Sequence, residues 1–184
     1  MISILSLWLP IGLSAVAVFL ASYLLWSLLP WHRSDFARLP NEEAVRAALR
    51  DVSPGAYSIP HTPDPKLLAD PEHRKKWEEG PLGFIVLMPK GLPKMGKTLG
   101  SWFVWNVLIA VFAAYLATRT LASGTDYLQV FRVVGTVTFL AYGAATVTDS
   151  IWFGRPWKSS LKLLVDALVY GCLTAGFFGW LWPR

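Results

Sequence analysis

The chain has 184 residues, of which 54% are hydrophobic and 16% are charged, with ten Trp and one Cys. This composition excludes a disordered chain, a collagen-like repeat and a small secreted module held by disulfides, because it is too apolar for the first and has too little Gly or Cys for the others. Residues 31–97 hold 11 of the 17 Lys and Arg, 9 of the 12 Asp and Glu, and all three His. Such segregation predicts membrane spans around one water-facing segment and argues against a soluble enzyme.

The first predicted span covers residues 1–31, which contain no charged side chain. A helix rises 1.5 Å per residue, so roughly 20 apolar residues cross a hydrocarbon core of about 30 Å. The segment lacks the basic start and the short apolar core of a cleavable signal peptide. We therefore expect a span that is retained in the mature protein.

Three further spans are predicted in residues 98–184, where they are expected to form a hairpin bundle joined by short turns. Their approximate limits are 98–121, 127–153 and 158–182. The third is flanked by Arg132 and Asp149, and the fourth contains Asp166. The predicted fold class is thus an all-α membrane protein with four transmembrane helices and a small cytoplasmic α+β insert, residues 32–97, between the first and second.

The distribution of basic residues predicts the orientation. Fourteen Lys and Arg lie on the side that holds the insert and the turn near residues 154–160, against three on the other side. Since cytoplasmic loops carry the excess of basic residues, we expect a cytoplasmic insert and both termini outside. The expected location is a bacterial inner (plasma) membrane.

The insert has the signals of two short helices and two short strands. One helix is expected after Asn41, where acidic residues face the positive end of the helix dipole, and another after the Asp70-Pro71 N-terminal signal. Residues 56–60 and 82–88 are bounded by Pro or Gly and are predicted to be strands that pair. Since a two-stranded ribbon is only marginally stable alone, we expect it to pack against helices, the membrane surface or a partner.

Residues 91–98 match the phosphate-binding string G-x-x-x-x-G-K-T letter for letter. The following helix is a predicted membrane span, and a nucleotide-binding sheet requires further strands that the sequence does not offer. We therefore interpret the segment as a basic entry into the second span. In this interpretation Lys90, Lys94 and Lys97 contact anionic lipid head groups.

Polar residues on the third and fourth spans are candidates for an ion or proton path, because ionisable groups within a membrane are commonly functional. Tyr142 and Asp149 lie on a polar stripe of the third span, and Lys162, Asp166 and Tyr170 share a face of the fourth. The alternative is a structural cluster in which Asp149 and Asp166 flank a lysine and fix the hairpin.

Small residues at Gly171, Ala175 and Gly179 form a ladder on the last span, which favours close helix packing within the chain or between copies. The three histidines, His32, His61 and His73, have no metal-site spacing and are expected to be surface residues. The sequence predicts no catalytic, metal or cofactor site, and no nucleic-acid partner.

Three functions remain open. The favoured one is a non-enzymatic accessory, assembly or interaction subunit of a membrane complex, whose partners are the bilayer and either its own copies or another membrane protein. The second is an oligomeric ion or proton channel, or a small transporter, that uses the polar stripes. The third is a membrane enzyme with an interfacial site around His32, His61 and Arg33.

Overall fold

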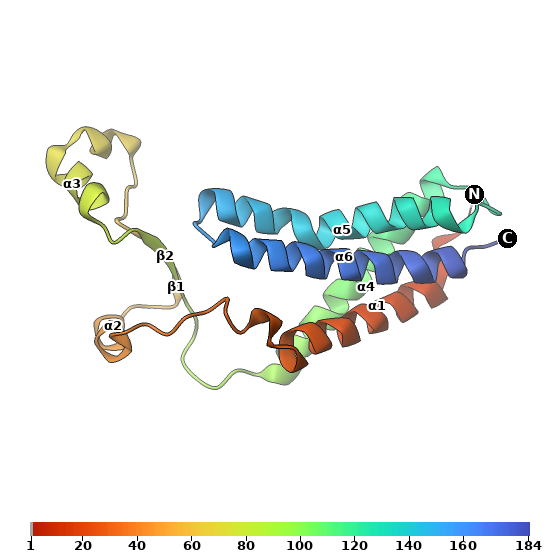
Figure 1. The fold of residues 1–184 in the computed structure, drawn as a ribbon, viewed down its shortest axis with the longest axis horizontal. Coiled ribbons are helices and arrows are strands. Elements are labelled where there is room, and N and C mark those ends of the chain that lie inside the picture. The colour runs from red at the N-terminus through yellow and green to blue at the C-terminus, as the bar shows by residue number, and fades with distance from the viewer. Residues whose placement is uncertain (1) are drawn as a thin grey trace. The chain divides into compact units, whose positions relative to one another are not determined.

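The computed structural model describes residues 2–184, which divide into two compact units. The membrane unit contains the chain up to Phe36 together with Lys94–Arg184, and the insert unit is Ala37–Pro93. Figure 1 labels the helices and strands of both units.

The membrane unit contains four helical segments that are long and apolar enough to cross a bilayer, as the sequence predicts. The first, Ile4–Leu28, consists of a 3₁₀ turn, helix α1 (Trp8–Tyr23) and a π-helical turn, Leu24–Leu28. The other three are α4 (Met95–Thr120), α5 (Tyr127–Trp152) and α6 (Trp157–Trp180). Length and composition therefore identify the same four segments in the structure as in the sequence.

The four spans form a ring of pairwise contacts. Helix α5 packs along α6, α1 packs against both α4 and α6, and α4 also contacts α5. The turn between α5 and α6 is short and passes through Gly154, whose φ of +68° favours glycine. This tight connection makes α5 and α6 antiparallel neighbours.

Small residues let α5 and α6 approach closely. A Cβ atom on Gly171 would lie 3.2 Å from the Gly135 carbonyl oxygen and 3.3 Å from the Phe139 nitrogen. A Cβ atom on Gly179 would lie 2.7 Å from the ring of Tyr127. The backbones of the two helices are therefore close enough to exclude larger side chains at these two positions.

The interior of the membrane unit has an apolar half and a polar half. The half that contains the start of α1 and the end of α4 is filled by apolar side chains, with Phe178 and Val130 completely buried. The half that contains the end of the first span and the start of α6 buries His32, Asn106 and Asp166 instead. The candidate site lies in this polar half.

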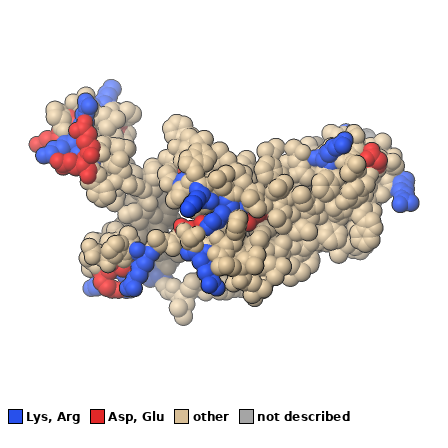
Figure 2. All heavy atoms as spheres, viewed as in Figure 1, with Lys and Arg blue, Asp and Glu red and all other residues tan. Residues whose placement is uncertain are grey.

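Charged side chains follow the same two-ended arrangement on the outer surface. On the face shown in Figure 2, those of the membrane unit gather toward its two ends and leave an uncharged band between them. Large apolar side chains such as Leu20, Phe112 and Leu168 are 54–62% exposed. An uncharged band rimmed by charge is the surface that a bilayer would cover.

The insert unit contains two short helices and one antiparallel ribbon. Strands β1 (Gly55–Ile59) and β2 (Gly83–Leu87) pair along their full length, so the predicted strands do form and do pair. The helices are α2 (Glu42–Ala48) and α3 (Pro71–Glu79). Asp70 caps α3 by accepting a hydrogen bond from the His73 backbone N–H at 3.1 Å.

The insert unit has no apolar core of its own. None of its residues is buried, and Val86, Met88 and Leu92 are 73%, 80% and 94% exposed. An ordinary folded domain of this size buries a large share of its apolar surface. The apolar side chains of the insert are therefore left for another molecule to cover.

The segment that matches the phosphate-binding string does not have a nucleotide-binding architecture. The sheet of the insert has two antiparallel strands, and α4 already begins at Met95. Gly96, Lys97 and Thr98 lie in the first turn of this long apolar helix. This agrees with the interpretation of the segment as an entry into the second span.

The close packing of α5 on α6 gives a first prediction. We expect Gly171→Val to lower the free energy of unfolding by about 1–3 kcal/mol, since the new side chain meets the α5 backbone. Gly100→Val is the control, because a Cβ atom there has no neighbour within 4 Å. Thermal unfolding midpoints in one detergent would compare the two variants, and equal midpoints would contradict this packing.

Candidate functional site

The residue at the centre of the site is His32, which lies just beyond the first span. Leu29 is extended, and Pro30 begins a 3₁₀ turn, Pro30–His32, that brings the chain back toward the bundle. The His32 side chain is buried, and the ring of Trp26 stacks on it with the centroids 3.9 Å apart and the planes 11° from parallel. His32 therefore occupies a fixed orientation inside the membrane unit, and the prediction that it is a surface residue is wrong.

Both nitrogens of the His32 ring contact a carboxyl group. Nδ1 lies 2.6 Å from Asp35 Oδ2, and Nε2 lies 2.8 Å from Asp166 Oδ2. The second contact joins the segment after the first span to the middle of α6, across 134 positions of sequence. All three side chains are less than 10% exposed, so water competes weakly for these hydrogen bonds.

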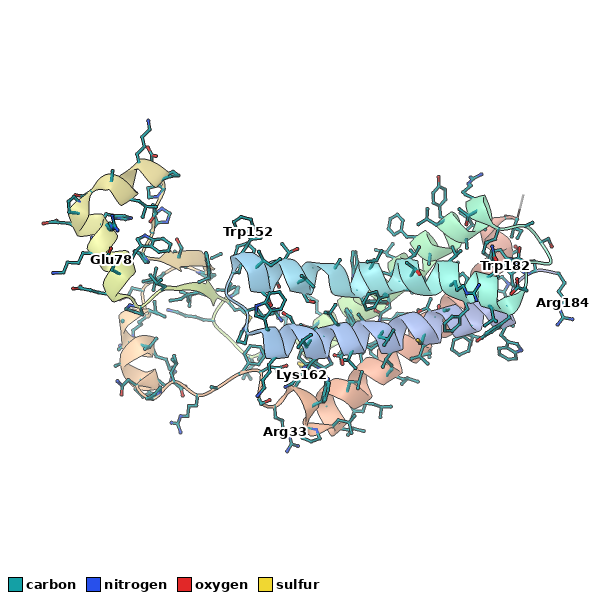
Figure 3. The ribbon with its side chains drawn as sticks, turned by 45° about the horizontal axis from the view of Figure 1, so that its top comes forward. Arg33, Glu78, Trp152, Lys162, Trp182 and Arg184 are labelled. Atoms are coloured by element: carbon teal, nitrogen blue, oxygen red, sulfur yellow. The ribbon has the colours of Figure 1, made fainter. Side chains whose placement is uncertain are left out.

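Asp35 is held in its ionised form by the groups around it. Its Oδ1 accepts hydrogen bonds from Lys162 Nζ at 2.7 Å and from Ser159 Oγ at 3.1 Å. Burial by itself raises the pKa of the Asp35 carboxyl, but the hydrogen bonds from Lys162, His32 and Ser159 outweigh it and lower the pKa from 3.8 to about 2. Asp35 is therefore an acceptor on both oxygens at neutral pH. Figure 3 shows Lys162 at the same end of the bundle as Arg33.

The two contacts of His32 determine how many protons His32, Asp35 and Asp166 hold between them. Since Asp35 is ionised, His32 Nδ1–H donates to it. A second proton must then lie between His32 Nε2 and Asp166 Oδ2. Either a protonated imidazole donates to the Asp166 carboxylate, or a neutral imidazole accepts from the protonated acid. In both cases the charges of Asp35, Lys162 and the His32–Asp166 pair sum to zero.

The other oxygen of Asp166 has no hydrogen-bond partner among the described residues, although it is buried. The next polar group along this face of α6 is Tyr170, whose hydroxyl is likewise buried without a hydrogen-bond partner among the described residues. A buried acceptor without a partner costs about 1–3 kcal/mol, so it marks a functional group or a place for bound water.

Aromatic rings continue the polar zone from Tyr170 toward the centre of the bundle. The Tyr142 and Tyr170 rings pack with centroids 5.2 Å apart, and Trp102 lies against both. The Tyr142 hydroxyl donates to Asn106 Oδ1 at 3.0 Å. Asn106 is 1% exposed, and its Nδ2 has no partner among the described residues.

The structure brings together four of the five residues that the sequence places on the polar stripes. Lys162, Asp166, Tyr170 and Tyr142 all lie in the polar half described above. Asp149 lies apart from them and pairs with Arg155 at 3.4 Å, with both side chains 40% exposed. The lysine therefore bridges to Asp35 rather than joining Asp149 to Asp166.

The residues of the small-residue ladder all face α5. Gly171 and Gly179 contact it as described, and the Cβ of Ala175 lies 3.3 Å from where a Cβ on Gly135 would stand. Lys90, Lys94 and Lys97 are exposed, with Lys94 immediately before α4 and Lys97 in its first turn.

The remaining histidines belong to the insert unit. His61 Nδ1 lies 3.2 Å from Ser58 Oγ, and His73 Nε2 lies 2.8 Å from Thr62 Oγ1. Among the described residues, no group of three or more His, Cys, Asp or Glu side chains has the geometry of a metal site. Arg33 is exposed and belongs with His32 to the membrane unit, whereas His61 belongs to the insert unit.

From the sequence, His32 was named as a site residue only in the enzyme alternative, with His61 and Arg33, and Asp35 was not named at all. The available signal was local: a histidine and a carboxylate three positions apart, directly after an uncharged span and a proline. This spacing allows one turn to bring both side chains to the same side. It does not reveal that α6 supplies the second carboxylate.

Comparison of the chain with protein-family models, with curated protein sequences and with solved structures found no match. The class of the protein is therefore defined by its own structure: a helical protein with four apolar segments of membrane-spanning length and a buried imidazole–carboxylate site.

The bonds to Asp35 give a second prediction. Because its folded-state pKa lies below the ordinary value, Asp35 adds stability above pH 3.8 that is lost as the pH falls toward 2. We expect Asp35→Asn to lower stability at pH 7 by about 2 kcal/mol, since charge-assisted hydrogen bonds are weakened. The difference from the unmodified protein should shrink between pH 4 and 2, as unfolding at graded pH would measure. Asp51→Asn, at an exposed position, is the control, and an equal effect of the two variants would contradict the assignment.

Proposed function

We propose that this chain is a non-enzymatic subunit of a membrane assembly and that its specific contribution is to bind and release a proton at His32 and Asp166. The observation that carries the proposal is the buried imidazole with a carboxyl group on each nitrogen. Imidazole is the side chain whose ordinary pKa lies nearest to physiological pH, so its proton is the one most readily exchanged.

Release of that proton would change the forces in the site. Without it, the lone pair of His32 Nε2 and an ionised Asp166 oxygen would face each other at 2.8 Å. The cluster would also carry a net charge of −1, because Lys162 balances only Asp35. Both effects favour separation of α6 from the segment after the first span, so proton release is coupled to movement or to entry of water.

The polar zone supports a path that reaches part of the way through the bundle. It extends from Asp35 through His32 and Asp166 toward Asn106, near the middle of α4. Beyond Asn106 the interior is filled by small and apolar side chains such as Ala113, Ala117 and Phe178. A proton can thus be handled from one side by one copy, whereas conduction across the membrane requires a second copy or another membrane protein.

This limit favours the subunit role over a self-sufficient channel or transporter. The same conclusion is supported by the insert unit, whose exposed apolar side chains call for a covering surface. The bias of basic residues supports an insert on the cytoplasmic side of a bacterial inner membrane, with both termini outside. In that orientation the His32 site exchanges its proton with the cytoplasm.

Infrared difference spectroscopy on the purified protein tests the proton site directly. We expect a carboxyl or imidazole band to change when the proton held between His32 and Asp166 is released. The band should be lost in Asp166→Asn and in His32→Gln. Asp149→Asn, at a partly exposed ion pair of the same bundle, is the matched control and should keep it. A titration that is identical in all four proteins would refute the proposal.

The subunit role predicts that the chain purifies as part of a larger assembly. We expect native mass spectrometry after mild solubilisation at native expression level to show more than one chain. Additional copies of this chain would identify a homo-oligomer, and a stoichiometric second protein would identify a heteromeric complex. A monomer with no companion in both detergent and nanodisc would contradict the role.

A further inference from the structure

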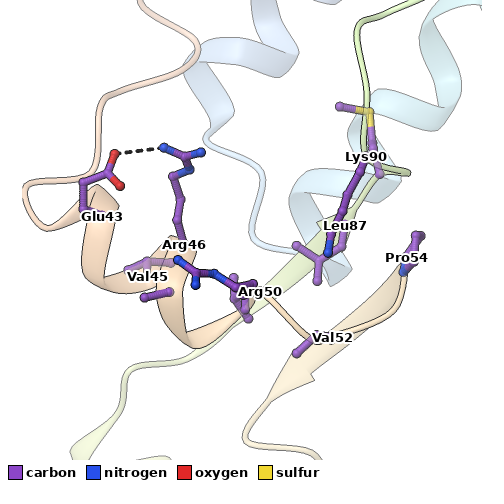
Figure 4. A pocket seen from close by; sticks show the side chains of 11 residues that line it. Glu43, Val45, Arg46, Arg50, Val52, Pro54, Leu87 and Lys90 are labelled. Atoms are coloured by element: carbon purple, nitrogen blue, oxygen red, sulfur yellow. Dashed lines mark hydrogen bonds and ion pairs between the residues drawn. The ribbon is translucent and has the colours of Figure 1, made fainter.

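The insert unit contains a groove that is independent of the His32 site. Its volume is about 410 Å³, and it lies between α2, the chain after it and the end of β2 (Figure 4). Apolar side chains form much of its lining, among them Val45, Leu49, Val52 and Leu87. Pockets that bind small molecules begin at about 300 Å³, so the groove is large enough for part of a ligand.

Positive charge surrounds this apolar lining. Three cationic side chains, Arg46, Arg50 and Lys90, border the groove together with one carboxylate, Glu43. Arg46 Nη1 donates to Glu43 Oε1 at 2.9 Å, as the dashed line in Figure 4 marks. Arg50 and Lys90 form no ion pair among the described residues. The groove is thus suited to a ligand with both an anionic group and an apolar part.

We propose that this groove binds an acidic phospholipid of the membrane to which the chain is tethered. Its phosphate would lie between Arg50 and Lys90, and the first part of an acyl chain would lie on Leu49 and Leu87. Arginine and lysine bind phosphate by charge-assisted hydrogen bonds, and the apolar lining gains from removal of water.

The length of the connecting chain supports a lipid as the occupant. Lys90 precedes Met95, the first residue of α4, by five positions. A fully extended chain spans at most about 3.6 Å per residue, so Lys90 lies within about 18 Å of the start of that helix. The polar head-group layer adjoins the span at this point. The groove is therefore held within reach of lipids by the covalent structure alone.

Two simpler ligands fit less well. A free phosphate would use the cationic side chains but leave Val45, Val52 and Leu87 exposed to water. A lipid with no net charge would cover the apolar lining but leave an excess of positive charge beside it. Of these ligands, only an anionic amphiphile contacts both the cationic and the apolar parts of the groove. In this proposal Lys90 therefore binds one lipid at a defined site, which is more specific than the general contact with head groups expected from the sequence.

The test is lipid binding by the full-length protein in an uncharged detergent, measured by native mass spectrometry. The probes are phosphatidylglycerol, phosphatidylcholine of the same acyl chains, and glycerol 3-phosphate as a free anion. We expect the R50Q/K90Q variant to lose roughly tenfold or more in affinity for phosphatidylglycerol, since two charge-assisted hydrogen bonds are removed. Leu49→Gln should weaken phosphatidylglycerol binding without changing the response to glycerol 3-phosphate.

The matched control is K66Q/K76Q, which removes two positive charges from exposed positions of the same insert outside the groove. It should bind phosphatidylglycerol as the unmodified protein does, and circular dichroism should confirm that both double variants fold. Equal loss in the two double variants would overturn the proposal, as would equal affinity for the two lipids. Displacement of the lipid by glycerol 3-phosphate at comparable concentration would show a free-anion site instead. Each of these results is independent of the titration at His32.

Discussion

The contact of His32 with two carboxyl groups is the constraint on which the polar half of the bundle depends. A charge buried without a partner is strongly unfavourable, so each member of the site requires the next. The turn that begins at Pro30 brings His32 and Asp35 back to the bundle, and α6 supplies Asp166 and Lys162. The same contacts hold the segment after the first span against α6. In the proposed function, the position of the Pro30–His32 turn against α6 therefore depends on the proton between His32 and Asp166.

The apolar half of the bundle makes such a site tolerable. Around Phe178 and Val134, helices pack through small residues and fully buried side chains, with no unpartnered polar atom among the described residues of that half. The glycines of α5 and α6 extend this close packing along both helices. Much of the close packing of the bundle thus lies away from His32, and the buried polar atoms without a partner among the described residues, on Asp166, Asn106 and Tyr170, lie outside this apolar half.

Spans and helix starts could be predicted from the sequence because they depend on local pattern. The contacts of His32 and Lys162 could not, because they join segments that are far apart in the chain. Uncharged runs located the four spans, and Asp70 with Pro71 located the start of α3, because hydropathy and capping act within a few residues. The shared face of Lys162, Asp166 and Tyr170 followed from helical spacing. The partner of Lys162 did not, because Asp35 and Asp149 are equally plausible until the path of the chain after the first span is known. His32 resembled an interfacial surface residue for the same reason.

The packing within the insert does not by itself explain why the insert is folded. Two strands of five residues and two short helices without a buried side chain are marginal in water. Both ends of the insert continue into apolar helices of membrane-spanning length, so the proposed insertion of these helices into a bilayer would fix a high concentration of lipid head groups around it. A ligand that binds only the folded insert stabilises it in proportion to the logarithm of that concentration. In the proposed binding of an acidic lipid, the exposed apolar side chains and the unpaired Arg50 and Lys90 therefore act together, because the bound lipid would cover apolar surface that the insert does not bury by itself.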